Sequence, residues 1–247
     1  MFRRNVFGQI IFFKKLLIKL VGFFTYPMFN WKNTTDIQGS AILADLAKEN
    51  VLLVSNHQTY FADVILISNV IYSVYNGKID TIKTPSFLWN MRHNVYFVAA
   101  EETMNKGLLP RLFKYGGAIT VKRTWRKDGE NINRKVDTKD TSNIGRALSE
   151  GWVITFPQGT TKPFVSGRKG TAHIIKEYRP TVVPVVINGF RRAFDKKGLF
   201  IKKKGTTLSA WFKEPLDIDY DASPDAILEQ VMEGIEQSEN FNKVKEN

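Results

Sequence analysis

Residues 51–63 read VLLVSNHQTYFAD, an apolar run that is followed by a polar segment. Residues 51–54 form a short, wholly apolar run, which is typical of a buried strand. Apolar periodicity resumes over residues 64–74 and predicts a helix that starts near Asp63, whose carboxylate is suited to capping it. The sequence therefore predicts a strand that leads directly through a polar turn into a helix.

The same alternation continues along the chain. Further strands are predicted at residues 95–99, 118–121, 152–156, 182–187 and 208–212. Helices are predicted at residues 41–48, 108–115, 144–150 and 171–178, and a last amphipathic helix begins at Ser223-Pro224. Residues 125–140 have the composition of a charged loop. The pattern favours an α/β fold with a central, mostly parallel sheet flanked by helices.

The composition limits the classes of function. A chain of 247 residues suits one large domain. It contains no cysteine, which excludes thiol nucleophiles, disulfides and Cys-ligated metals. The three histidines, His57, His93 and His173, are far apart in the sequence, so no metal site is predicted.

Charge is distributed unevenly. Residues 1–213 contain 34 Lys and Arg against 14 Asp and Glu, whereas residues 214–247 contain 2 against 10. A strongly basic body favours an anionic partner, which leaves nucleic acid, an acidic carrier protein and an anionic membrane as candidates. A basic cluster at residues 191–204 fits either a solvated face, an anionic lipid or an acidic carrier.

Among these candidate partners, the composition of the N-terminal residues favours a membrane. Residues 1–32 contain six Lys and Arg and no acidic residue. On a helix, Lys14, Lys15 and Lys19 share one side, and bulky apolar residues recur on the other: Val6, Ile10, Phe13, Leu17, Leu20 and Phe24. Lysines near the middle disfavour a spanning helix. We expect residues 1–32 to be an amphipathic membrane-associating segment, the alternatives being a signal peptide and an ordinary core helix with a basic edge.

The polar turn after the first buried strand carries the chemistry. A histidine has a pKa near working pH, and a carboxylate that accepts its Nδ1 hydrogen leaves Nε2 free to act as a base. Asp63 lies six positions after His57, and no G-x-S-x-G serine, cysteine or phosphate-binding loop accompanies them. The base is therefore expected to act on a substrate hydroxyl.

Four segments together resemble the glycerolipid, or 1-acylglycerol-phosphate-type, acyltransferase family. NHQTYFAD (56–63) is similar to its first block, GGAITVKR (116–123) to its second, FPQGTT (156–161) to its third and VPVVING (183–189) to its fourth. The blocks occur in the family's order, and they span residues 51–189. The resemblance implies that residues 33–247 form an acyltransferase domain.

The resemblance also implies roles for individual residues. His57 is expected to deprotonate the acceptor hydroxyl, Asp63 to orient His57, and Arg123 to contact an anionic group of the acceptor. Gly159 and Thr160 match the third block, where the glycine permits close approach of the backbone to the ligand. The expected donor is acyl-coenzyme A or acyl-acyl carrier protein, with no cofactor, metal or nucleic acid. The expected location is peripheral or monotopic on the cytoplasmic face of a membrane.

The chain departs from the family pattern at three places. Five residues, not four, separate His57 from Asp63, and the turn must absorb the extra one. Gln158 replaces the usual glutamate, and Thr161 replaces an arginine suited to phosphate.

These departures bear on the acceptor. Lys162 or Arg168 is placed to supply the missing cation, and Asn56, Gln158, Thr161 and Lys162 count as substrate-binding positions. We hypothesise an acceptor other than lysophosphatidate, such as a lyso-aminoacyl lipid. Two alternatives stay open at this point: a non-catalytic lipid-binding protein that retains the fold, and a hydrolase in which the same base activates water.

Overall fold

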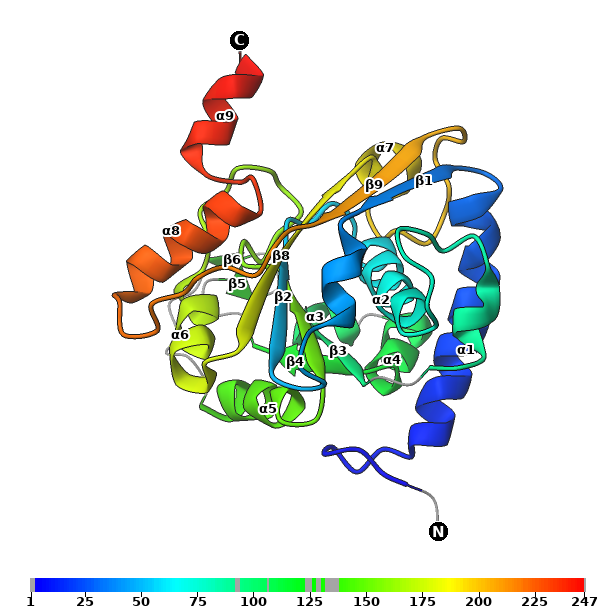
Figure 1. Cartoon of the computed structure of the whole chain (residues 1–247), viewed down its shortest axis with the longest axis horizontal. Coiled ribbons are helices and arrows are strands. Elements are labelled where there is room, and N and C mark those ends of the chain that lie inside the picture. The colour runs from blue at the N-terminus through cyan, green and yellow to red at the C-terminus, as the bar shows by residue number, and fades with distance from the viewer. Residues whose placement is uncertain are drawn as a thin grey trace.

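Strand β2 (Val51–Ser55) lies inside a seven-stranded sheet of order β1-β9-β8-β2-β7-β3-β4 in the computed structural model (Figure 1). The structure describes residues 3–91, 94–105, 107–122, 126–127, 130–131 and 138–246. The other strands of this sheet are β1 (Thr34–Gln38), β3 (Val95–Ala100), β4 (Ala118–Val121), β7 (Trp152–Thr155), β8 (Thr181–Asn188) and β9 (Thr207–Phe212). All neighbouring strands are parallel except β8 and β9. The predicted α/β fold with a mostly parallel sheet is confirmed.

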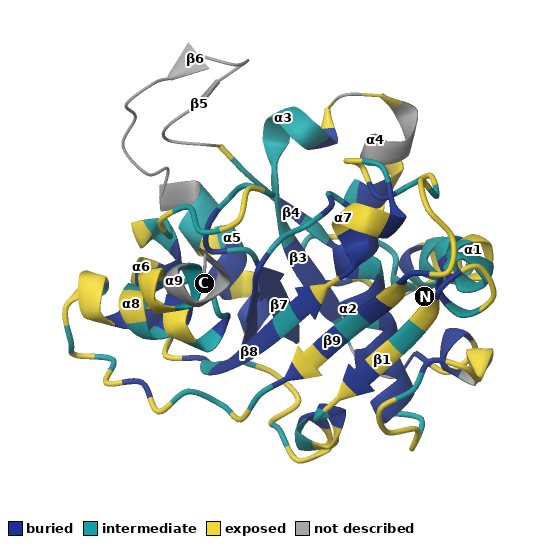
Figure 2. Ribbon diagram, turned by 90° about the horizontal axis from the view of Figure 1, so that it is seen from above, coloured by how far each residue is buried: buried dark blue, intermediate teal, exposed yellow. Residues whose placement is uncertain are grey.

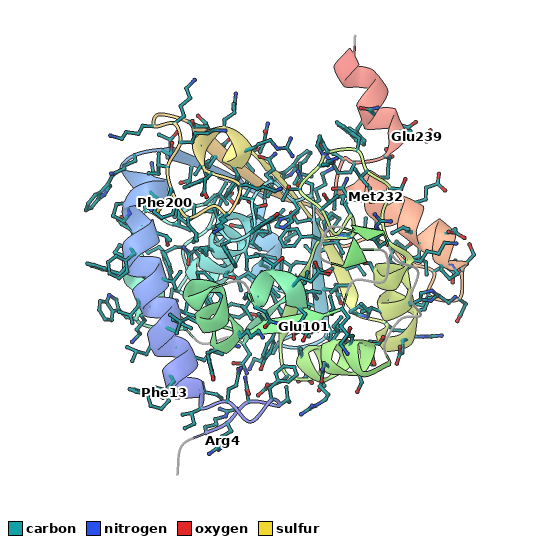
Figure 3. The ribbon with its side chains drawn as sticks, turned by 180° about the vertical axis from the view of Figure 1, so that it is seen from behind. Arg4, Phe13, Glu101, Phe200, Met232 and Glu239 are labelled. Atoms are coloured by element: carbon teal, nitrogen blue, oxygen red, sulfur yellow. The ribbon has the colours of Figure 1, made fainter. Side chains whose placement is uncertain are left out.

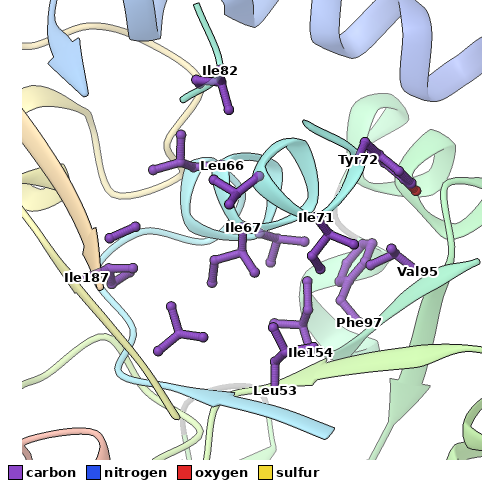
Figure 4. Packing of buried hydrophobic residues seen from close by; sticks show 14 of the residues in the cluster. Leu53, Leu66, Ile67, Ile71, Tyr72, Ile82, Val95, Phe97, Ile154 and Ile187 are labelled. Carbon is purple, nitrogen blue, oxygen red and sulfur yellow. The ribbon is translucent and has the colours of Figure 1, made fainter. Parts of the chain in front are cut away.

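Helices cover both faces of the sheet because its central strands are apolar on both sides. All five residues of β2 are buried, and their side chains alternate between two cores. Leu53 packs into one core with α1 (Ile11–Asn30), α2 (Ala62–Val74), α4 (Leu108–Tyr115) and α7 (Phe190–Ala193). Leu52 packs into the other core with α5 (Thr138–Leu148), α6 (Lys169–Tyr178) and α8 (Pro224–Gly234). Figure 4 shows the first core, where Leu53 and Ile154 lie below Ile67.

Most of the predicted strands and helices are present, and their ends differ by a few residues. The strands predicted at 95–99, 118–121, 152–156, 182–187 and 208–212 and the helices at 108–115 and 171–178 are confirmed. The predicted helix at 41–48 is only a 3-10 helix, η1 (Ser40–Ala44). A second 3-10 helix, η2 (Pro85–Leu88), and a short helix, α3 (Glu101–Met104), complete the connections. Helix α5 begins before the predicted 144, and α9 (Glu239–Glu246) follows the helix predicted to be the last.

Two segments differ in kind from the prediction. No strand was predicted at residues 34–38, which are mostly polar, but they form the edge strand β1, because their backbone pairs with β9 and only Ile37 is buried. The predicted charged loop at 125–140 lies largely outside the described residues. Its described parts include a small antiparallel pair, β5 (Arg126–Lys127) with β6 (Glu130–Asn131), and the start of α5.

Helix α1 is oriented differently from the prediction, which placed Lys14 on a solvated polar face. The helix begins at Ile11, so Val6 and Ile10 precede it. Lys14 is buried and its Nζ donates to the carbonyl of Val95 at 3.0 Å, over the ring of Tyr96. The face of the helix that meets the core includes Gly22 and Phe29, which are buried, and Lys14 lies on this face.

Several bulky apolar residues of α1 face outward instead, as Phe13 does in Figure 3, and Figure 2 shows that part of the helix is exposed. We call this surface the outer face of α1, and its exposed residues are Phe12, Phe13, Leu16, Leu20, Phe23 and Phe24, with Trp31 just beyond the helix. Phe23 is 69% and Phe24 70% exposed. Within the described parts of the chain, no helix has both the length and the apolarity required to cross a bilayer.

Candidate active site

The carboxyl end of β2 positions a histidine against a carboxylate. His57 follows β2 by two residues, and its Nδ1 lies 2.9 Å from Oδ2 of Asp63, which is fully buried. The imidazole ring also stacks on Phe156, which follows β7, at a centroid distance of 3.9 Å. No described residue hydrogen-bonds to Nε2 of His57. This arrangement holds the ring at its Nδ1 edge and on one face, and it directs Nε2 away from the carboxylate.

The turn absorbs the extra residue between His57 and Asp63. Oδ2 of Asp63 also accepts the backbone N–H groups of Gln58 at 2.6 Å and Thr59 at 2.9 Å, and Oδ1 accepts the Thr59 hydroxyl at 2.6 Å. The carboxylate therefore organises the turn that precedes α2. The prediction that Asp63 caps α2 is wrong, because Asp63 lies inside the first turn of the helix and bonds backward to the loop.

A cavity of about 350 Å³ opens beside His57 at the carboxyl edge of the sheet. Residues that follow or end four parallel strands line it: His57 after β2, Ala99 in β3, Lys122 after β4 and Phe156 after β7. The carboxyl ends of parallel strands face the usual ligand crevice of open α/β sheets. Much of the wall is apolar, and its larger apolar side chains are Tyr60, Phe61, Val64, Phe97, Met104, Val121, Ile144, Phe156 and Ile174.

Residues 33–188 match the model of a known protein family, and the name of this family is acyltransferase. The chain belongs to the acyltransferase family. The match begins at β1 and ends with β8, so it includes His57, Asp63 and most of the strands that line the cavity.

Several solved structures resemble this acyltransferase, and one of them aligns along nearly its whole length. It is the 1-acyl-sn-glycerophosphate (LPA) acyltransferase PlsC from Thermotoga maritima, which aligns with a TM-score of 0.60 over 95% of this chain and 82% of the other. The two sequences are 19% identical, so the likeness establishes a shared fold. No curated protein sequence matches the chain significantly.

Five of the six residues of the third block reach the cavity of this acyltransferase, and Gln158 is the exception among them. Gly159, Thr160 and Thr161 line it together with His57. Gly159 has a φ of +62°, which favours glycine, and its N–H donates to the carbonyl of Phe156 in a tight turn. The turn brings the backbone of the block to the rim of the cavity.

Two other predicted binding residues use their amides inside the protein. The side chain of Asn56 donates to the carbonyl of Ile187 at 2.9 Å and accepts its N–H at 2.8 Å, which ties β2 to β8. Gln158 is buried and donates to the carbonyl of Val165 and to Oε1 of Gln237. Neither belongs to the described residues that line the cavity.

The structure separates the two cations proposed to replace the missing arginine. Arg168 lines the cavity, whereas Lys162 is exposed and lies outside the described lining. Arg123, the predicted contact for an anionic group, lies outside the described residues, and its neighbour Lys122 lines the cavity. His93 also lies outside the described residues.

Sequence reasoning missed several residues of the cavity. His173, which carries no motif, lies on α6 and lines the cavity together with Lys169. The signal for both was weak, namely that they sit on the helix that follows the third block. The described residues contain no group of three or more His, Asp or Glu placed to hold a metal ion.

Proposed function

We propose that this family member is a membrane-surface O-acyltransferase that transfers a fatty acyl group from acyl-acyl carrier protein or acyl-coenzyme A to the hydroxyl of a lyso-lipid. The observation that carries the proposal is the 2.9 Å contact between His57 Nδ1 and Asp63 Oδ2 beside a largely apolar cavity. Family membership supplies the reaction class, and the pair supplies a base for it.

In the proposed reaction, Asp63 accepts the Nδ1 hydrogen and so fixes the tautomer in which Nε2 of His57 carries a lone pair. Nε2 takes the proton of the acceptor hydroxyl while the oxygen attacks the thioester carbonyl carbon. The tetrahedral intermediate collapses with formation of the ester and cleavage of the carbon–sulfur bond. The proton on Nε2 passes to the departing thiolate, which leaves as a thiol. No enzyme nucleophile is needed, in keeping with a chain that lacks cysteine.

The apolar wall of the cavity supports a fatty acyl substrate. Phe61, Val64 and Phe97 line the main cavity and also a second, smaller apolar cavity of about 60 Å³. The smaller cavity is bounded by Leu17 and Val21 of α1. We infer that the acyl chain extends from His57 toward α1, because this direction keeps it among apolar side chains.

The identity of the acceptor depends on Thr161 and Arg168. Since Gln158 bonds to Gln237 away from the cavity, its replacement of a glutamate does not bear directly on the head group. Thr161 lines the cavity with no cation of its own, and Arg168 is the lining guanidinium of the same loop. We retain a lyso-lipid acceptor, either lysophosphatidate-like or a lyso-aminolipid, with the second favoured by the threonine.

The outer face of α1 supports a location of the protein at the membrane surface. We propose that residues 1–32 associate with the membrane and that residues 33–247 form the acyltransferase domain, a division that agrees with the start of the family match at residue 33. Contiguous exposed apolar side chains mark interaction sites, and an interfacial helix buries them among lipids. The enzyme is then peripheral or monotopic, on the cytoplasmic face.

The proposal is tested by supplying the purified protein with radiolabelled acyl donor and a panel of lyso-lipids. We expect transfer to a lyso-lipid, and His57→Ala should reduce it by a factor of about 100 or more while vesicle binding is retained. Equal activity of His57→Ala would refute the role of the base. A wild-type protein that binds vesicles but transfers no acyl group to any acceptor would favour the lipid-binding alternative. Faster acylation of lysophosphatidate than of a non-phosphate lyso-lipid would remove the lyso-aminolipid reading.

A further inference from the structure

Residues 194–205, which connect α7 to β9, form a cationic surface loop that we call the basic loop. Its five lysines are all exposed: Lys196, Lys197, Lys202, Lys203 and Lys204. Phe200 stands among them with 69% of its surface exposed. The acidic residue of the loop, Asp195, accepts the backbone N–H groups of Leu199 and Phe200, both at 2.9 Å, and so shapes the turn. The loop therefore presents an aromatic ring surrounded by cations.

Both ends of the basic loop contact the C-terminal end of α1. The ring of Phe194 packs on Phe29 at a centroid distance of 5.9 Å, and the N–H of Gly205 donates to the carbonyl of Lys32 at 2.8 Å. Trp31, 75% exposed, lies next to this junction. Figure 3 shows Phe200 beside the end of α1 that is opposite to Phe13. The loop and the outer face of α1 are thus neighbouring parts of one surface.

The combined surface carries both lysines and bulky apolar side chains, and its partner must match both. An acidic carrier protein would match the lysines but would leave the bulky apolar side chains of α1 without an apolar partner. An anionic bilayer satisfies both parts, since acyl chains receive the apolar residues and head groups attract the lysines. Aromatic rings beside cations are also typical of the membrane–water interface.

The inner side of the same loop holds the turn between His57 and Asp63. The carbonyl of Lys196 accepts the N–H of Tyr60 at 3.1 Å, and that of Lys197 accepts the N–H of Phe61 at 2.9 Å. Tyr60 and Phe61 lie in the turn that has one residue more than the family pattern that the sequence resembles. The loop thus satisfies backbone donors that the lengthened turn would otherwise leave without a partner.

Gly198 allows this close approach. Its φ is +76°, and a Cβ at this position would lie 2.7 Å from both Ala62 N and Thr59 Oγ1. Thr59 in turn donates to Asp63 through the same hydroxyl. Gly205 has a similar φ of +68° in the same loop, but a Cβ there would meet nothing within 4 Å. Alanine would be strained by the backbone conformation at either glycine, but only at Gly198 would its Cβ also clash with the turn.

We propose that the basic loop is a second lipid-contacting element, selective for anionic head groups, and that its inner side positions the His57–Asp63 pair. Lipid contact on the outer side of the loop then steadies the turn on its inner side. The positioning role rests on the proposed function of the pair, whereas the lipid contact does not.

Lipid contact is tested by flotation with vesicles of phosphatidylglycerol and phosphatidylcholine. The variant K197Q/K203Q/K204Q should bind vesicles rich in phosphatidylglycerol about 100-fold more weakly than wild type, at roughly fivefold per lysine. The control K197R/K203R/K204R keeps the charge and should bind like wild type. Binding to pure phosphatidylcholine should be equal for all three proteins. Equal binding of the glutamine variant to anionic vesicles would overturn the lipid contact.

Positioning is tested with Gly198→Ala against Gly205→Ala. We expect Gly198→Ala to lower kcat at least tenfold and to move the acidic limb of the pH–rate profile, which reports the base, while vesicle binding stays unchanged. Gly205→Ala should leave kcat and the profile unchanged. Equal kcat values and profiles for the two variants would overturn the positioning role. If wild type shows no acyl transfer at all, the proposed function fails, and the vesicle experiment still decides the lipid contact.

A measurement on the wild-type protein covers the case in which Gly198→Ala does not fold. Amide hydrogen exchange of Tyr60 and Phe61 should slow when phosphatidylglycerol vesicles are added and stay unchanged with phosphatidylcholine. Exchange that is indifferent to the anionic vesicles would refute coupling between the two sides of the loop.

Discussion

Lys14→Met is expected to stabilise the protein near neutral pH and to lose this advantage as the pH rises. The ammonium group of Lys14 is buried where α1 meets β3, with Tyr96, the carboxylate of Glu150 and the neighbouring Lys15 as the surrounding ionisable groups. Burial lowers the pKa of Lys14 from 10.5 to about 7, although Glu150 opposes the shift. Folding therefore favours the neutral amine.

The sign and size of the change in unfolding free energy follow from the linkage between protonation and folding. Between pH 7 and 10.5 the unfolded chain binds more protons at Lys14 than the folded chain, so wild-type stability rises with pH in this window. At 1.4 kcal/mol per pKa unit, the penalty is about 4 kcal/mol at pH 7 and about 2 kcal/mol at pH 9. Methionine removes this penalty but leaves the Val95 carbonyl without its donor, at a cost of about 1–3 kcal/mol. The advantage of the variant should thus shrink by about 2 kcal/mol from pH 7 to pH 9.

Urea unfolding followed by circular dichroism at pH 7, 8 and 9 measures this difference. Lys15→Met, which removes a partly exposed ammonium from the same helix, is the control and should change stability by less than about 0.5 kcal/mol. A Lys14→Met advantage that is the same at pH 7 and pH 9 would refute the reasoning, because it would mean that Lys14 stays protonated on folding.

Three further predictions concern the site and the membrane. Asp63→Asn should lower kcat about 100-fold or more in the acyl-transfer assay, because the carboxylate orients His57 and four hydrogen bonds converge on it; a kcat within threefold of wild type would contradict this. Arg168→Ala should raise the KM for an anionic acceptor, whereas Lys162→Ala, outside the described lining, should not; equal KM values would remove the assignment of Arg168. Replacing both Phe23 and Phe24 with serine should weaken vesicle binding at least tenfold, since burial of each ring in the bilayer contributes about 1.5–3 kcal/mol. Unchanged flotation would exclude the outer face of α1 from the contact.

Those parts of the fold and the site that depend on local sequence pattern were predictable before the structure was known. The apolar runs of β2 and β7 predicted buried parallel strands, because a strand that is covered on both faces must be apolar on both sides. The position of NHQTYFAD after such a strand placed His57 at the carboxyl edge of the sheet, where the structure has it. The residue types alone predicted a histidine–carboxylate pair.

Features that depend on contacts between distant segments became visible only in the folded chain. Helical periodicity placed Lys14 on one face of α1 but not whether that face meets solvent or the sheet, because both orientations satisfy the same period. Asn56 and Gln158 looked like ligand contacts, yet each has protein partners that lie far along the chain. The lengthened turn left the His57–Asp63 geometry open, and the basic loop, more than 130 residues later in the sequence, supplies the carbonyls that accept its backbone donors. A hydrogen bond between such segments has no local sequence pattern, so only the folded chain reveals it.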